Sequence, residues 1–183
     1  MWNKGLSYRE RHGLGHAGMN KGIHTNVDDT LHTDTNASKH SLGLVFFPAF
    51  DWKISETHPE RQERLLYTRD QIVEEGLLDI PNIKEYNPIV ADWDTIERVH
   101  VGAPDLESWV TEAHRVSAGG AIVAADAVMR GEVDRAFALV RPPGHHAMAM
   151  VHGIRGFCTI NIEAVMIPVS YTHLRAHETE ADL

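Results

Sequence analysis

The stretch that most constrains the fold spans residues 136–158 and reads AFALVRPPGHHAMAMVHGIRGFC. It begins with a short apolar run at 136–140, whose lack of polar alternation is typical of a strand buried on both faces of a parallel sheet. Pro142 and Pro143 must end that strand, because proline has no N–H to give to a neighbouring strand. In open α/β sheets, ligands bind in the loops that leave the carboxyl ends of the strands. The sequence therefore predicts a functional loop directly after Val140.

Two adjacent histidines, His145 and His146, lie in this loop. In a regular strand their side chains would point to opposite faces and would not share a site. After Pro-Pro-Gly we expect an irregular backbone, which lets the two rings converge. Histidine is also the side chain best suited to moving protons near neutral pH. The alternative is a loop with two ordinary histidines in a chain that contains 13, and composition alone does not decide between the two.

The rest of the pattern alternates short apolar runs with helical spacing. We expect strands at Leu42–Phe47 and within residues 83–90, a helix from a Thr57 cap and Glu60 capping box to Gly76, a short helix capped by Asp92 or Asp94, and helices over 104–115 and 117–130. In the last helix, Gly119 and Gly120 would allow close packing against neighbouring backbone. Helix, short turn and buried strand is the order of a βαβ unit, so the predicted class is α/β.

Composition excludes several function classes. The 183 residues are enough for one domain with a core, and the 43% hydrophobic and 23% charged contents are ordinary. A net charge of −9 argues against a general nucleic-acid binder. The one cysteine excludes an internal disulfide and fits a reducing compartment. Without a long apolar run or a signal-peptide pattern, we expect a cytoplasmic protein with no membrane partner.

The run RPPGHHA, followed by Gly156, Phe157, Cys158 and Asn161, resembles the signature of the histone deacetylase family. That family includes bacterial histone deacetylase-like amidohydrolases and acetylpolyamine amidohydrolases. A more diffuse similarity runs back to about Leu42, so the resemblance covers residues 42–166. It implies the N-terminal part of an arginase/deacetylase-like parallel sheet, flanked by helices on both faces and incomplete.

The resemblance also implies a function, the zinc-dependent hydrolysis of an acetyl group on a lysine or polyamine nitrogen. His145 and His146 match the family's catalytic pair, with His146 as the group for proton transfer and His145 in a shaping and stabilising role. Gly156 and Phe157 match the pair that lines the narrow channel for the acyl-lysine stem. Asp105 is the nearest candidate for a rim aspartate that holds the substrate backbone, although its position near a helix start is an alternative explanation.

The zinc ligands that the resemblance implies lie in an Asp-x-His motif and a later aspartate, and a downstream tyrosine serves the oxyanion. Nothing of that kind follows Met166, so we assign no metal ligand and expect the chain to be an incomplete, inactive piece. Two other classes stay open. One is a non-catalytic acyl-lysine or small-molecule binding module that lacks the metal, and the other is a small metal-binding protein that uses the terminal histidines.

We expect three segments along the chain. Residues 1–41 are polar, lack periodicity and are interpreted as a flexible leader, and residues 42–166 form the partial deacetylase-like domain. Residues 167–183 form a tail outside the family pattern, in which SYTHLRAHET resembles translated sequencing-adapter read-through, an artefact. The competing interpretation is a helical metal site in which His173 and His177, four residues apart, act with Glu178.

Overall fold

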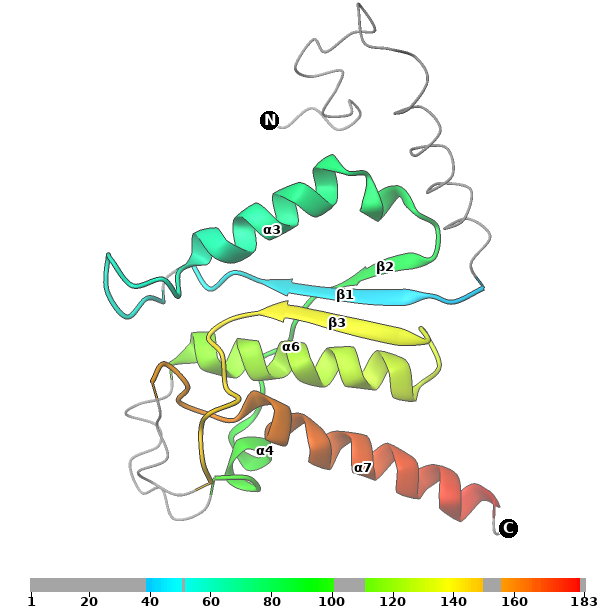
Figure 1. Ribbon diagram of the computed structural model, residues 1–183. Helices are drawn as coiled ribbons and strands as arrows, with labels where there is room; N and C mark the ends of the chain where they lie inside the picture. Colours follow the sequence, from blue (N-terminus) through cyan, green and yellow to red (C-terminus); the bar gives the residue numbers. More distant parts are fainter. Residues whose placement is uncertain (1–38, 51, 101–110, 150–155, 182–183) are drawn as a thin grey trace, which may run out of the picture.

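A computed structural model describes residues 39–50, 52–100, 111–149 and 156–181 (Figure 1). Most of the expected leader, and Asp105 with it, lies outside these ranges. In chain order the elements are β1 (Leu42–Phe47), α3 (Gln62–Glu74), the 3₁₀ helix η1 (Leu77–Asp79), β2 (Ile83–Tyr86), α4 (Trp93–Glu97), α6 (Glu112–Met129), β3 (Arg135–Val140) and α7 (Ile162–Ala181).

The strands form one parallel sheet in the order β2-β1-β3. The central strand, β1, spans the residues that the sequence predicts, and its register pairs Leu42 with Arg135 and Phe47 with Val140. In Figure 1, α3 covers one face of the sheet, and α6 with α7 lies on the other. The predicted α/β class, with a parallel sheet flanked by helices on both faces, is confirmed.

Helix α6 packs closely on the sheet because its middle is built from small residues. A Cβ on Gly119 would lie 1.9 Å from the carbonyl oxygen of Ile89, and one on Gly120 would lie 2.7 Å from Cγ1 of Val140. The predicted role of the glycine pair in close packing is therefore confirmed. The helix is continuous from Glu112, so it joins the end of the helix predicted over 104–115 to the helix predicted over 117–130, and Thr111 begins it by forming a capping box with His114. Residues 104–110 of the first prediction lie outside the described residues.

The expectation for β3 is wrong in one respect, since the strand is not buried on both faces. It is the edge strand of the described sheet, and its side chains alternate between half-buried and exposed at its first residues. Phe137 is 54% exposed. Helix α6 packs against β3.

The start predicted for α3 is also wrong. The helix begins at Gln62 after Arg61, without a side-chain cap, rather than at the expected box of Thr57 and Glu60. The reason is that the Glu60 carboxylate binds Arg141, 81 residues away, and so does not serve the helix end. The predicted C-terminal ends of α3 and α6 are confirmed, because Gly76 after α3 and Gly131 after α6 both have positive φ angles.

The main core lies between α4, α6 and α7, on the side of α6 that faces away from the sheet. Its buried members are Ala91, Ile96, Ala118, Ile122, Ile160, Ile162 and Val165.

Asp92 caps α4 by accepting the Thr95 N–H at 2.6 Å, as one of the two predicted caps. Helix α7 contains Pro168 and crosses the boundary expected after Met166. None of the described helices is long and apolar enough to cross a membrane.

Candidate active site

The loop after β3 begins where the sequence predicts, since the strand ends at Val140. The peptide bond between Arg141 and Pro142 is cis. The Ser117 hydroxyl of α6 donates to the Pro142 carbonyl at 2.7 Å, and the Ala147 N–H donates to the Gly144 carbonyl at 3.0 Å. These bonds fix the backbone on both sides of the two histidines.

Arg141 anchors the start of this loop and is completely buried. Its Nε donates to Glu60 Oε1 at 2.9 Å, and its Nη1 donates to the carbonyls of Pro48 and Ala49, each at 2.7 Å. Its Nη2 donates to the Trp52 carbonyl at 3.0 Å and to the Glu60 carbonyl at 3.3 Å. The guanidinium also lies 5.1 Å from the Trp52 ring centre. All the polar groups of a buried cation are thereby engaged.

Sequence reasoning missed this anchor, although one signal was present. An arginine that directly follows a buried apolar run cannot lose its charge, so it must find an anionic partner and several acceptors within the fold. Which carboxylate serves is decided by tertiary packing, which brings Glu60 to Arg141.

The rings of His145 and His146 converge, as predicted. Their centres lie 4.1 Å apart at an interplanar angle of 62°, and both side chains are exposed. Cys158, which is buried as predicted, lies beside them. The ligand atoms of the three side chains are all within 4.8 Å of one another. Two exposed imidazole rings therefore lie close to one buried sulfur atom.

The Cys158 thiol is not poised as a nucleophile. Burial raises its pKa, and the charges of Glu163 and Glu60 raise it further, while a hydrogen bond from the His146 backbone lowers it. The net effect is a pKa above the ordinary value, so the sulfur carries its proton at neutral pH.

A second set of contacts holds the histidine loop against the segment before α7. A Cβ on Gly144 would lie 2.4 Å from the Ile160 carbonyl oxygen, so only glycine permits this approach. The side-chain amide of Asn161 donates to the Ala147 carbonyl at 2.9 Å, and the backbone N–H of Asn161 donates to Nε2 of His100 at 3.0 Å. Burial lowers the pKa of His100 and keeps it neutral as an acceptor. The role of His100 was not predicted.

The channel residues sit at the edge of this arrangement. Gly156 has a φ of +58° and is exposed, and Phe157 packs its ring edge-on against His58 at 5.1 Å. His58 also accepts the Glu60 N–H at Nδ1 (3.0 Å). The assignment of Gly156 and Phe157 to a substrate channel stays a prediction. Asp105, the candidate for binding the substrate backbone, lies outside the described residues.

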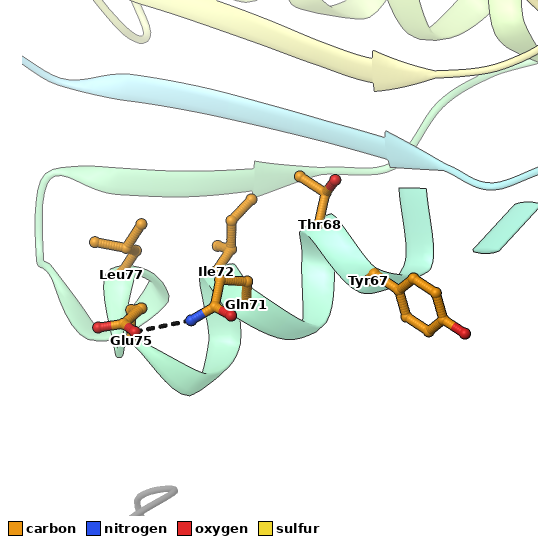
Figure 2. Close-up of a pocket in the computed structure, with 6 residues that line it drawn as sticks. All are labelled: Tyr67, Thr68, Gln71, Ile72, Glu75 and Leu77. Carbon is orange, nitrogen blue, oxygen red and sulfur yellow. Dashed lines mark hydrogen bonds between the residues drawn. The ribbon is translucent and has the colours of Figure 1, made fainter. Parts of the chain in front are cut away.

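A depression of about 420 Å³ lies elsewhere, on α3 and η1 (Figure 2). It is lined by Tyr67, Thr68, Gln71, Ile72, Glu75 and Leu77. Two of its polar side chains bind each other, since the Gln71 amide donates to the Glu75 carboxylate at 2.8 Å, and the Thr68 hydroxyl donates to the Arg64 carbonyl at 2.8 Å. None of the predicted site residues lines it.

The described residues do not fit a catalytic zinc beside the histidine pair. Such an ion needs three protein ligands and one open position. Within the described ranges, one group brings three possible ligand atoms together, and it consists of His145, His146 and Cys158. If the two histidines act as acid and base, Cys158 alone remains as a ligand.

Comparison with known proteins gives matches in sequence and in structure. Residues 105–178 match the histone deacetylase domain family, and this match runs past Met166. The Archaeoglobus fulgidus protein named "Probable deacetylase" is 37% identical over 144 residues, which cover 68% of this chain and 40% of the relative. A histone deacetylase-like amidohydrolase from Pseudomonas aeruginosa is 50% identical over 56 residues, 31% of this chain and 14% of the relative.

A polyamine deacetylase from Mus musculus is 30% identical over 125 residues, which cover 68% of this chain and 14% of the relative. The chain thus spans 40% or less of the length of these three relatives. The crystal structure of the HDA15 HD domain matches with a TM-score of 0.60 and 24% identity, over 72% of this chain and 43% of that one. This structural match concerns the fold alone.

Proposed function

Because this chain is a relative of the histone deacetylases, we propose that the protein hydrolyses an acetyl-amide of the acetyl-lysine or acetylpolyamine type. The observation that carries the proposal is the convergence of His145 and His146 on a loop anchored by buried Arg141. The names of the relatives cover both substrate types, a polyamine deacetylase and a histone deacetylase-like amidohydrolase. We also propose a cytoplasmic location, since the one cysteine is unpaired, as is usual in a reducing compartment.

Amide hydrolysis requires one group that takes a proton from water and one that gives a proton to the leaving amine. We assign both transfers to a ring nitrogen of His146, with His145 beside it as an electrostatic partner. Both rings are exposed and so can reach water and substrate. Phe157 offers an aromatic face to the alkyl stem, Gly156 leaves room for it, and Asp105 is the candidate for holding the substrate backbone. Zinc is the cofactor that the family resemblance adds to the proposal, and the described residues hold no ligand set for it besides the histidine pair.

The test uses the reading frame of the source DNA, expressed through to its stop codon. Acetate release is measured from an acetyl-lysine peptide and an acetylated polyamine, with and without zinc. We expect His146→Ala to lower turnover by about 10²–10⁴-fold while the catalytic zinc stays bound, because the proton-transfer group is lost. The control is His40→Ala, whose ring lies 3.8 Å from Asp134 before the start of β3. Undiminished turnover of His146→Ala would contradict the assignment.

The 183-residue chain alone should show no turnover, even with added zinc, since the described residues offer no ligand set besides the histidine pair. Clear zinc-dependent turnover by this chain would contradict that expectation. Binding of an acetyl-lysine peptide without hydrolysis by the complete frame would favour the alternative, a non-catalytic binding module. Sequencing the DNA across the codons for residues 161–183 checks the proposed boundary of the tail at residue 167.

A further inference from the structure

The cluster of His145, His146 and Cys158 has a composition that acid–base chemistry does not require. Its three donor atoms are two imidazole nitrogens and one sulfur, all within 4.8 Å of one another. We propose that these three side chains form a binding site of their own for a thiophilic divalent cation such as Zn²⁺ or Cd²⁺. The site is separate from the catalytic zinc of the proposed function, which acts beside the histidines rather than on them.

The donor types and spacing suit this class of ion. Zinc bonds of about 2.0–2.1 Å to nitrogen and about 2.3 Å to sulfur place tetrahedral ligand atoms about 3.4–3.6 Å apart. The present spacing therefore has to close by about 1 Å. Within the described residues, no hydrogen bond holds either imidazole ring, so both exposed rings can turn toward the sulfur. The exposed side of the rings leaves the fourth position open to water.

The backbone that carries the donors is already in place. Gly144 lies against the Ile160 carbonyl, and the side-chain amide of Asn161 donates to the Ala147 carbonyl, so these contacts hold the two loops together. An ion therefore has only side-chain rotations to order, which lowers the cost of binding. The negative charge of Glu163 near the Cys158 sulfur also favours a cation, whereas the charge of Glu60 is already compensated by Arg141. When an ion binds, the thiol proton leaves to the buffer and an S–metal bond forms.

Occupation of this site would inhibit hydrolysis, and this consequence alone rests on the proposed function. The ion would use the ring nitrogens whose lone pairs take up and deliver the proton. The binding itself stands independently of any turnover.

The experiment is a Co²⁺ titration of the reduced 183-residue chain. A thiolate bound to Co²⁺ gives a near-ultraviolet charge-transfer band, and the chain has one cysteine, so the band reports on Cys158 alone. We expect the band to saturate at one equivalent and to disappear when Zn²⁺ or Cd²⁺ is added. His145→Asn and His146→Asn should each lower the affinity for Co²⁺ by tenfold or more. The matched controls, His40→Asn and the double variant H173N/H177N, should leave the band unchanged.

Cys158→Ser should remove the band, and its far-ultraviolet circular dichroism shows whether the variant folds. If that buried substitution unfolds the chain, the two exposed histidine variants decide. No band at stoichiometric Co²⁺, or Co²⁺ binding without a sulfur band, would overturn the site, as would a band that neither histidine variant weakens. A band in the 183-residue chain supports the site whether or not the complete reading frame is active, and a lack of hydrolysis by the complete reading frame counts only against the proposed function, so the two failures are distinguishable.

Discussion

At the scale of single residues, the histidine loop depends on one buried cation. Arg141 is 0% exposed, and the carboxylate of Glu60 is its anionic partner at 2.9 Å. Glu60 also accepts from Arg64 at 2.8 Å, so it links the end of β3 to the first turn of α3. A buried ion pair adds little net stability by itself, but removing one partner leaves a charge without compensation.

We therefore predict that Glu60→Ala lowers the free energy of unfolding by about 3–5 kcal/mol. The matched control is Glu56→Ala, since Glu56 pairs with Lys53 on the surface and its side chain is 80% exposed. That substitution should leave the urea midpoint nearly unchanged. Urea unfolding followed by circular dichroism measures both variants. Equal shifts of the two midpoints would show that the Arg141 charge does not need Glu60.

At the scale of elements, contacts from α6 position the start of the histidine loop. Ser117 holds the Pro142 carbonyl, and three residues later Gly120 lies against Val140 at the end of β3. Between them, Gly119 lies against the Ile89 carbonyl in the segment before α4. A displacement of this helix would move the start of the histidine loop as well.

Gly119→Ala tests this packing. Alanine is favoured over glycine within a helix by about 1 kcal/mol. The new Cβ would lie 1.9 Å from a backbone oxygen, which cannot rotate away. We expect the clash to win, with a net loss of roughly 1–3 kcal/mol in the free energy of unfolding.

The comparison variant is Gly131→Ala, where nothing lies within 4 Å of the new Cβ and the φ of +69° causes the only strain. That strain should cost about 1–2 kcal/mol. In addition, Gly119→Ala should increase hydrogen exchange at the Ala147 N–H, which bonds to the Gly144 carbonyl in the histidine loop, and Gly131→Ala should not. Unchanged protection of that amide in Gly119→Ala would refute the coupling of α6 to the loop.

At the scale of the whole molecule, folding buries two histidines in the part of the chain that the structure describes, and both are neutral. Burial lowers the pKa of His114 to about 4, and it also lowers the pKa of His100. His114 lies at the start of α6, where its Nδ1 accepts the Thr111 N–H, and its ring packs edge-on against Trp52. Between the folded and unfolded pKa values, the unfolded chain binds more protons than the folded one.

The free energy of unfolding should therefore be highest above about pH 6.5 and should fall as the pH drops toward 4. His114 alone would account for about 3 kcal/mol of this loss. His114→Gln, which keeps a side chain suited to the capping box, should flatten the profile of melting temperature against pH. His40→Gln serves as the exposed control and should not alter the profile. An unchanged slope in His114→Gln would mean that other groups govern the acid response.

Local chemistry determined several features directly from the sequence. The prolines after Val140 end β3 because they lack the N–H of a ladder, and they leave the irregular backbone on which His145 and His146 converge. Gly76 ends its helix because it accepts a positive φ, and Asp92 caps α4 because its short side chain reaches a free N–H. Each of these outcomes depends on one residue and its immediate neighbours along the chain.

Only the tertiary structure decided the features that depend on distant partners. Glu60 serves Arg141 rather than its own helix, because a buried cation outweighs a helix cap. Phe137 is exposed because what packs against the faces of β3, and not the apolar sequence of the strand, sets the burial of its side chains. Cys158 lies beside the histidine pair because Gly144 and Asn161 join the two loops. The sequence determined what each segment forms, and packing between segments determined which side chains meet.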